Sequence, residues 1–373
     1  MTDAGESPAL VLPDVDGACV ANLVPALLGP RGTGALPPWF PPAVRDARQV
    51  VLLVLDGLGW QQLCDRRALA PTLAALVGGP ITTVAPSTTA TALTSITTGL
   101  QPGEHGVVGY RFPVRSEVLN TLRWSTPAGD ARTRIPPHRI QPVPAFLGAS
   151  VPVVTKAEFA SSGFSGAHLA GARLHGYRAL STMLVELRRL LVAGERFVYA
   201  YYDGIDKVAH EYGFGEHYDA ELAFADELAA RVRDLLPADA ALLVTADHGQ
   251  VHVGDAVRTL DPSIRALVAH QSGEGRFRWL HARAGAAADL EAAARAAHGH
   301  EAWVVSTETI VADRWFGATV TPTARARLGD VALVARDAVS FDDAADSGPY
   351  HLVCRHGSLT ADEMLVPLLA AGP

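Results

Sequence analysis

Cysteine is scarce in this sequence, and no apolar run in it is long enough to cross a membrane. Three cysteines occur among 373 residues, far apart and in no CxxC pair, so we expect isolated thiols in a reducing compartment. A membrane span needs roughly 18 or more consecutive apolar residues, which no stretch approaches. Residues 1–30 contain neither lysine nor arginine, so they lack the charged start of a secretory signal. The sequence therefore predicts a cytoplasmic protein with no membrane partner.

Clusters of basic residues are also missing. The 31 lysine and arginine residues are outnumbered by 39 aspartate and glutamate residues, which gives a formal net charge of −8. Affinity for the backbone of nucleic acids comes from clustered basic side chains, so a general nucleic-acid binder is disfavoured. A small anionic substrate remains compatible, because a bound metal ion can supply positive charge locally. With 49% hydrophobic and 19% charged residues, the composition is that of a globular protein.

Four short apolar runs are each followed by acidic or histidine residues. They are residues 50–55 before Asp56, 197–202 before Asp203, 241–245 before Asp247, and 350–354 before His356. Continuous rather than alternating hydrophobicity is typical of strands covered on both faces, as in a parallel sheet. Helices are predicted between them, over 180–191 and 218–236. We therefore expect one α/β domain over residues 1–373, a mostly parallel central sheet with helices on both faces, and polar side chains gathered at the carboxyl edge of that sheet.

Two segments fit this pattern less well and are interpreted as insertions that shape substrate access. The first covers approximately residues 111–150 and is rich in proline. The second covers approximately 254–347. It contains a hairpin-like stretch at 277–283 and an alanine-rich helix over about 284–297, with an irregular remainder.

Six acidic and histidine residues have the spacing of metal ligands. Asp206 and His210 are four positions apart, which on a helix places both side chains on one face. The other four are Asp56, Asp247, His248 and His356. Mixed carboxylate and imidazole donors suit Zn²⁺, with Mn²⁺ or Fe as alternatives, better than Ca²⁺. Six ligands exceed the needs of one ion, and two divalent ions ~4 Å apart serve phosphoryl transfer.

A nucleophile is expected within residues 85–94, where Pro86 and Ser87 begin a predicted helix. A hydroxyl in a first helical turn is surrounded by free N–H groups, which favour a bound phosphate. Ser87, Thr88 and Thr89 all offer a hydroxyl, but Ser87 is better explained as the N-cap. The residues alone do not decide between the others.

At this point the sequence resembles the nucleotide pyrophosphatase/phosphodiesterase branch of the alkaline phosphatase superfamily. The resemblance is carried, in order, by the segments APSTT (85–89), TGLQPGEHG (98–106), YDGIDKVAHEYG (202–213), TADHG (245–249) and RHG (355–357). It implies that Thr89 is the nucleophile. It also implies one metal site formed by Asp206, His210 and His356, and a second formed by Asp56, Thr89, Asp247 and His248.

Two positions differ from that family's pattern. Ala90 stands where an aromatic residue usually follows the nucleophile and stacks on a nucleotide base. Gly109 and Tyr110 follow the HG segment where an asparagine usually contacts the phosphate, so Tyr110 and Asn120 become the candidate substrate-binding donors. These differences leave the expected chemistry in place and disfavour a nucleotide as the substrate.

The expected function is metal-dependent hydrolysis of a small-molecule phosphoric ester, of the phosphodiesterase or nucleotide pyrophosphatase type, through a covalent phospho-threonine. The alternatives are a phosphomonoesterase, phosphonate hydrolase or sulfate-ester hydrolase on the same two-metal scaffold, and a metal-binding protein without catalysis. The sulfatase alternative is weakened because no cysteine lies in the nucleophile segment. The sequence does not indicate the oligomeric state.

Overall fold

The computed structural model describes residues 8–29, 36–346 and 351–372. Its centre is a seven-stranded sheet in the order β2-β19-β10-β1-β9-β7-β8. The strands are β1 (Gln49–Leu55), β2 (Val77–Thr82), β7 (Pro152–Lys156), β8 (Arg173–Tyr177), β9 (Phe197–Tyr202), β10 (Ala240–Thr245) and β19 (Leu365–Ala371). All neighbouring pairs are parallel except those made by β19, which is antiparallel to both β10 and β2. The prediction of a mostly parallel central sheet is confirmed.

The three apolar runs that end in Asp56, Asp203 and Asp247 are β1, β9 and β10, and they are adjacent. Every residue of these strands is buried, as continuous hydrophobicity predicts. In the register, Leu55 pairs with Tyr202 and Val54 with Thr245, so the three strands end at nearly the same level. The residues that follow them therefore meet at one edge of the sheet.

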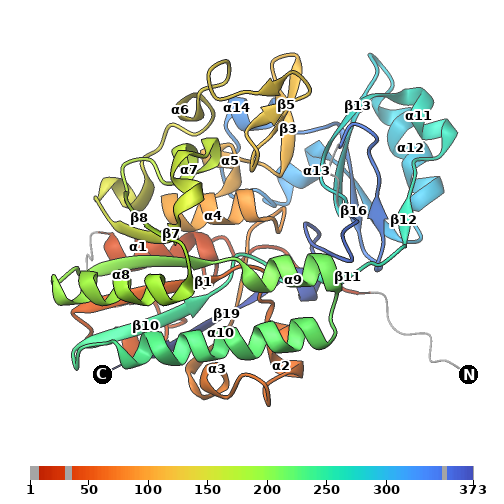
Figure 1. The fold of residues 1–373 in the computed structure, drawn as a ribbon. Coiled ribbons are helices and arrows are strands. Elements are labelled where there is room, and N and C mark those ends of the chain that lie inside the picture. Colours follow the sequence, from red (N-terminus) through yellow and green to blue (C-terminus); the bar gives the residue numbers. More distant parts are fainter. Residues whose placement is uncertain (1–7, 30–35, 347–350, 373) are drawn as a thin grey trace, which may run out of the picture.

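Helices cover both sides of the sheet, with α4 and α7 on one side and α2, α3 and α10 on the other (Figure 1). The predicted helices are present as α8 (Leu180–Val192) and α10 (Glu216–Asp234). The remaining helices of this part are α1 (Leu23–Leu28), α2 (Trp60–Asp65), α3 (Pro71–Ala75), α4 (Thr89–Thr98), α5 (Pro102–His105), α7 (Gly163–His168), α9 (Gly204–Tyr212) and α15 (Ala361–Met364). Single 3₁₀ turns lie at η1 (Val20–Asn22), η2 (Pro42–Val44) and η4 (Ala157–Ser161).

The first insertion begins with a small antiparallel sheet, in the order β3-β4-β5-β6. Its strands are β3 (Arg111–Val114), β4 (Glu117–Asn120), β5 (Ser125–Thr126) and β6 (Gly129–Asp130), and α6 (Pro137–Ile140) and η3 (Ala145–Gly148) follow. Trp124 anchors this part, because its buried indole N–H donates to the Ile135 carbonyl at 2.7 Å.

The second insertion has a core of its own and lies beside the main sheet (Figure 1). The hairpin-like stretch is β14 (Phe277–Ala282), paired with β13 (Val268–Gly273), and the alanine-rich helix is α12 (Ala287–His298). The remainder is more regular than expected, because β15 (Ala302–Ser306) and β16 (Val331–Ala335) complete a four-stranded antiparallel sheet. The other elements are α11 (Pro262–Leu267), α13 (Thr307–Ala312), α14 (Pro322–Arg325), β12 (Val257–Arg258) and β17 (Ser340–Phe341).

The strand expected over residues 350–354 is wrong. Tyr350 lies outside the described residues, and only Cys354–Arg355 form a short strand, β18, which pairs with β11 (Val251–His252) away from the central sheet. The Val353 N–H donates to the His210 carbonyl at 2.7 Å, and the Val353 carbonyl accepts from Val253 and Gly254. These bonds occupy the backbone groups that a place in the sheet would need.

Two further observations concern the expected location of the chain. The three cysteines are free, and burial raises the pKa of Cys19 to about 11 and that of Cys354 to about 12. In the part of the chain that the structure describes, no helix combines the length and the apolar character of a membrane span.

Candidate active site

The carboxyl edge of the central sheet brings together all six predicted metal-ligating residues. Asp56 directly follows β1, and Asp247 and His248 follow β10. The helix α9 begins after β9 and carries Asp206 and His210 one turn apart, as their spacing predicts. His356 arrives separately, on the segment after β18.

Asp206, His210 and His356 form the first cluster. Their nearest donor atoms all lie within 4.8 Å of one another. The Nε2 atoms of His210 and His356 are 3.3 and 3.9 Å from Asp206 Oδ1. Each Nδ1 lies close to a backbone carbonyl, that of Cys354 at 2.7 Å for His210 and that of Ser87 at 3.0 Å for His356. Because a carbonyl only accepts, Nδ1 carries the proton and Nε2 keeps its lone pair for a metal ion.

His248 is the centre of the second cluster. Asp56, Asp206 and His248 also lie within 4.8 Å of one another, so Asp206 is shared between the two groups. His248 Nε2 is 3.5 Å from both Asp56 Oδ1 and Asp247 Oδ2. It is 3.1 Å from the Thr89 hydroxyl oxygen. The His248 Nδ1–H donates to the Gly249 carbonyl at 3.0 Å, so the Nε2 lone pair faces the Thr89 hydroxyl and the carboxylate oxygens of Asp56 and Asp247.

Burial controls the charges of this site. It raises the pKa of Asp56 well above the ordinary aspartate value, and repulsion from Asp247 and Asp206 adds to the effect. Burial also raises the pKa of Asp206 and of Asp247. It lowers the pKa of His248, and it lowers that of His356 further. Three carboxyl groups that repel one another, beside imidazoles that resist protonation, form a site that favours a metal cation.

Two buried carboxylate oxygen atoms without hydrogen-bond partners in the described part of the chain also indicate a site for a metal cation. Asp56 Oδ1 and Asp247 Oδ2 are buried and have no hydrogen-bond partner among the described residues. Their companion oxygens are occupied, because Asp56 Oδ2 accepts from the Tyr201 hydroxyl and Asp247 Oδ1 accepts from the Gly57 N–H at 3.2 Å. A buried carboxylate oxygen without a partner is costly unless a cation binds it. The donor set therefore fits a divalent metal.

Thr89 is the first residue of α4, and the residue that occupies the N-cap position is Thr88. The prediction that Ser87 is the N-cap is wrong. The Ser87 hydroxyl instead donates to the Ser358 carbonyl at 2.6 Å and accepts from the Gly357 N–H at 3.2 Å. Ser87 and Gly357 also form a backbone bridge, so Ser87 joins the nucleophile segment to the His356 segment.

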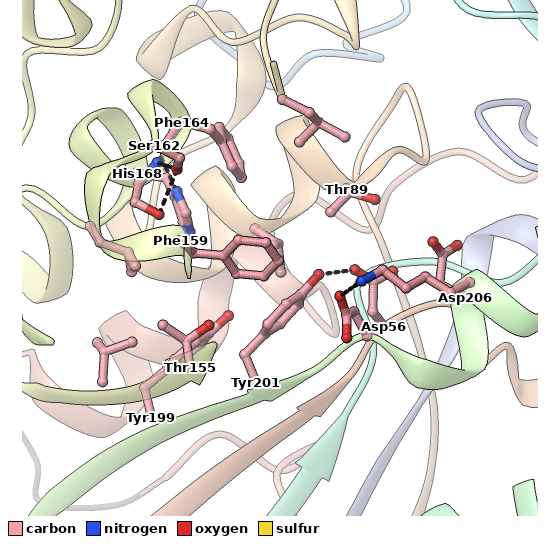
Figure 2. A pocket seen from close by; sticks show the side chains of 17 residues that line it. Asp56, Thr89, Thr155, Phe159, Ser162, Phe164, His168, Tyr199, Tyr201 and Asp206 are labelled. Atoms are coloured by element: carbon pink, nitrogen blue, oxygen red, sulfur yellow. Dashed lines mark hydrogen bonds and ion pairs between the residues drawn. The ribbon is translucent and has the colours of Figure 1, made fainter. Parts of the chain in front are cut away.

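A cavity of about 220 Å³ opens beside Asp56, Thr89 and Asp206. Its walls come from β7, η4, α7 and β9, and Figure 2 shows Phe159 and Tyr201 between Asp56 and the α7 side of the cavity. The cavity residues used below are Phe159, Phe164, Tyr199, Tyr201, Asp203 and Lys207. The Tyr199 hydroxyl is buried and has no hydrogen-bond partner within the described ranges. The cavity thus combines aromatic walls with a polar group that a bound molecule can satisfy.

Apart from Asp203, the sequence did not single out these cavity residues. Phe159 and Phe164 belong to a stretch without a motif. The sequence therefore did not indicate that this stretch contacts the edge of the sheet. Tyr199 and Tyr201 carried one signal, because alternate residues of β9 face the same side and that strand ends beside the predicted ligands.

Tyr110 and Asn120 lie together but are linked to each other rather than to the cluster. The Asn120 amide donates to the Tyr110 hydroxyl at 2.5 Å, and the Asn120 carbonyl oxygen accepts from the Arg123 N–H at 3.0 Å. Burial raises the pKa of Tyr110, so the phenol remains a donor at neutral pH. Their contact with a substrate stays a prediction.

The comparisons with known proteins agree with this architecture. The family model of type I phosphodiesterase / nucleotide pyrophosphatase matches residues 50–183 and 172–359. Among curated proteins, none matches the chain. Murine ectonucleotide pyrophosphatase / phosphodiesterase 5 has a similar structure, with a TM-score of 0.64 and 16% sequence identity over 87% of this chain and 88% of that one.

Two further solved structures are similar. An inactive form of the same murine protein, in complex with AMP, has a TM-score of 0.62 and 15% identity over 87% of this chain and 88% of that one. Phosphonoacetate hydrolase from Sinorhizobium meliloti 1021, in complex with phosphonoformate, has a TM-score of 0.61 and 19% identity over 87% and 90% of the two chains. At these identities the likeness shows the fold.

Proposed function

Because the chain belongs to the type I phosphodiesterase / nucleotide pyrophosphatase family, we propose that it is a metal-dependent hydrolase that cleaves small phosphoric esters through a covalent phospho-threonine at Thr89. The observation that carries this proposal is the position of the Thr89 hydroxyl oxygen, which lies 3.1 Å from His248 Nε2, the ring nitrogen with the free lone pair, within the Asp/His clusters.

Two divalent ions, with Zn²⁺ favoured by the mixed donors, would be held at this edge of the sheet. Asp206, His210 and His356 would hold one, and Asp56, Thr89, Asp247 and His248 the other. When bound, such ions neutralise the phosphoryl oxygens and favour the deprotonated form of the attacking hydroxyl and of the leaving oxygen. The orphaned oxygens of Asp56 and Asp247 support this assignment.

The reaction at Thr89 would proceed in two steps. Thr89 Oγ1 loses its proton to solvent and forms a bond to phosphorus while the bond from phosphorus to the ester oxygen breaks, and the leaving oxygen takes a proton from solvent and departs as the alcohol. Water then cleaves the phospho-threonine, which returns the Thr89 hydroxyl and releases the phosphoryl product. The backbone N–H groups at the start of α4 provide hydrogen bonds to the phosphoryl oxygens. Tyr110 and Asn120 are the proposed additional donors.

The cavity supports binding of the organic group of the ester. Phe159, Phe164 and Tyr201 offer apolar and aromatic surface next to Thr89. A cavity of about 150 Å³ with apolar walls is large enough for a benzene ring, so about 220 Å³ accommodates one ring with a substituent. The residue after the nucleophile, Ala90, is fully buried in α4 and has no aromatic ring to offer a substrate.

A second candidate function is hydrolysis of a phosphonate or phosphomonoester that carries another negative group. The sequence contains two lysines, Lys156 and Lys207, and each places its ammonium 2.6 Å from a different oxygen of buried Asp203. Asp203 and Lys207 line the cavity, and the group of three carries one net positive charge. That charge favours a substrate with a carboxylate or a second phosphate in the cavity.

A substrate panel tests both candidates. We expect bis-p-nitrophenyl phosphate to be hydrolysed faster than p-nitrophenyl phosphate, and p-nitrophenyl sulfate not to be hydrolysed. Release of phosphate from phosphonoacetate would favour the second candidate. If Zn²⁺ raises the melting temperature of the wild-type protein and no ester or phosphonate is cleaved, the protein binds metal without catalysis and the proposal is wrong.

Its place in the cell is also a proposal. The three free thiols support a reducing compartment, and we propose the cytoplasm. Cell fractionation with detection of the native protein tests this, and recovery outside the cytoplasmic fraction would contradict it.

A further inference from the structure

A buried ion pair connects the second insertion to the segment that precedes β19. Arg276 lies in the turn between β13 and β14, and Glu363 lies in α15. The Arg276 Nε–H and Nη2–H donate to the two carboxylate oxygens of Glu363 at 2.7 and 2.8 Å, and both side chains are fully buried. Arg276 Nη1 also donates to the carbonyls of Asp337 and Val339, each at 2.8 Å. The guanidinium is thus fixed within the insertion.

Glu363, the acidic member of this pair, contacts the segment that carries His356. Glu363 Oε1 accepts from the Ser358 N–H at 2.9 Å, two residues after His356. The Ser358 carbonyl in turn accepts from the Ser87 hydroxyl, and the Ser358 hydroxyl donates to the Ala335 carbonyl of the insertion. Glu363 therefore holds a segment that contacts both the nucleophile region and the insertion.

The same residue contacts the His248 segment. The Gly249 N–H donates to the Glu363 backbone carbonyl at 2.9 Å, directly after His248. The neighbouring Met364 carbonyl accepts from the Thr83 N–H at 2.8 Å, and the Thr83 hydroxyl donates to the Asp247 carbonyl. Both histidine segments are thus attached to one short helix, which Arg276 fixes from the opposite side.

Stability alone gives little reason for such a pair. Removing two charges from water is costly, and buried ion pairs replaced by apolar residues of similar volume often leave stability unchanged or raise it. A bidentate arginine fork does fix direction and distance, which apolar contacts do not. The pair is therefore better explained by the fixed direction and distance that it gives to the segments it joins.

We propose that Arg276 is a positioning residue for ester hydrolysis, which acts through Glu363 to hold the His248 and His356 segments at the spacing that metal binding and cleavage require. This inference rests on the proposed function, because it takes His248 and His356 as metal ligands. It gives the second insertion a role in catalysis that does not depend on contact with the substrate cavity.

The test compares Arg276→Met, Glu363→Met and the double variant. Each single variant leaves one buried charge unpaired, so its melting temperature is expected to fall. The double variant removes both charges and is expected to regain most of the wild-type melting temperature. Its kcat/KM and its affinity for Zn²⁺, titrated on the metal-free protein, are nevertheless expected to stay about tenfold or more below wild type, as after loss of residues that orient metal ligands.

The control is the partly exposed pair Arg258 and Glu301 in the same insertion, joined at 2.9 Å; among the described residues neither side chain forms a hydrogen bond with the His248 or His356 segment. Its double methionine variant is expected to keep activity and Zn²⁺ affinity within about twofold of wild type. Recovery of melting temperature, activity and Zn²⁺ affinity together in Arg276→Met/Glu363→Met would overturn the proposal, since it would show a structural role only.

Two further arms keep the test decisive. If the double variant does not fold, Arg276→Lys decides, because it keeps the charge and loses the fork. Wild-type activity and Zn²⁺ affinity in that variant would contradict the proposal, and loss of both would support it. If the wild-type protein hydrolyses nothing in the panel, the proposed function fails, and the Zn²⁺ titration still tests the positioning role by itself.

Discussion

The imidazole rings of His248 and His356 stack on each other, with ring centroids 3.6 Å apart and an angle of 17° between their planes. They come from segments more than 100 positions apart, one after β10 and one after β18. Each also contacts the nucleophile segment, His248 through the Thr89 hydroxyl and His356 through the Ser87 carbonyl. Displacement of either ring should therefore disturb the environment of Thr89.

Removal of the Thr89 hydroxyl tests the nucleophile. We expect Thr89→Ala to lower kcat by more than about a thousandfold, because no other atom replaces the attacking oxygen. Bound metal, measured by elemental analysis, should remain close to wild type, since the remaining ligands are carboxylates and imidazoles. Thr89→Ser is the matched control and should keep measurable turnover. Full activity in Thr89→Ala would remove the assignment.

Metal binding should raise the stability of the folded protein. A ligand that binds only the folded state at about one hundred times its Kd adds about 2.7 kcal/mol to the free energy of unfolding. We expect Zn²⁺ to raise the melting temperature of the metal-free protein and His356→Ala to reduce the increase. His138→Ala, which changes an exposed histidine, should leave the increase unchanged. An equal increase in all three proteins would contradict the metal site.

The sequence predicted the parts of the fold that depend on local pattern. Residues 50–55, 197–202 and 241–245 are continuous apolar runs, and they form adjacent buried strands whose ends collect the acidic residues. Residues 350–354 carry the same pattern, but in the described part of that run Val353 forms its backbone hydrogen bonds with His210, Val253 and Gly254 instead of with a strand of the central sheet. Periodicity does not reveal which backbone partners a short run will find.

The candidate site was predictable to a similar extent. The spacing of Asp206 and His210 gave their placement on one helix face, and all six acidic and histidine residues lie together, although their roles remain predictions. Ser87 was misinterpreted because its partners, Gly357 and Ser358, are about 270 positions away. Phe159 and Phe164 reach the cavity only through the packing of η4 and α7, which no local pattern encodes.

The aromatic wall of the cavity should affect substrate binding more than turnover. We expect Phe159→Ala to raise KM for bis-p-nitrophenyl phosphate by about tenfold, because it removes apolar surface that contacts the organic group. The effect on kcat should be smaller. Phe224→Ala, at a half-exposed phenylalanine in α10, is the control and should leave both constants unchanged. An unchanged KM in Phe159→Ala would place the organic group elsewhere.

Two buried histidines that are not among the predicted metal ligands should make the protein sensitive to acid. Burial lowers the pKa of His105 to about 3 and that of His168 to about 4, against an ordinary value of 6.5. In the unfolded chain both take up a proton as the pH falls below 6.5, while in the folded protein they stay neutral. Their contribution to stability is therefore complete above pH 6.5 and is lost as the pH falls toward the folded pKa.

Substitution of one of them should reduce this dependence. The free energy of unfolding should lose about 1.4 kcal/mol per pH unit through His105 between pH 6 and 4, and through His168 down to about pH 5, below which its folded form begins to bind the proton. His105→Asn keeps an acceptor for the Val107 N–H and should lower the slope by about that amount in denaturant titrations. His138→Asn, at an exposed position, should leave the slope unchanged. Equal slopes in His105→Asn and wild type would show that His105 is not held neutral.

Gly357, which follows His356, should tolerate no side chain while Glu274 is present. Its φ of 120° is unfavourable for other residues, and an added Cβ would lie 2.7 Å from Glu274 Cγ. Gly129 has a φ of 91° and no atom within 4 Å of an added Cβ, so Gly129→Ala measures the backbone cost alone. We expect Gly357→Ala to destabilise more than Gly129→Ala and to lower Zn²⁺ affinity, because the displaced segment carries His356.

The contact with Glu274 can be separated from the backbone cost. Burial raises the pKa of Glu274 to about 8, so its side chain is mostly protonated at pH 7 and its removal leaves little uncompensated charge. In a Glu274→Ala background the crowding atoms are absent, so Gly357→Ala should cost no more stability than Gly129→Ala does in the wild type. The difference between the two backgrounds, measured by denaturant unfolding, is the contribution of this contact. If that difference is zero, the Glu274 side chain moves aside freely, and the position of His356 depends on its other contacts, among them the Ser87 hydrogen bond and the stacking on His248.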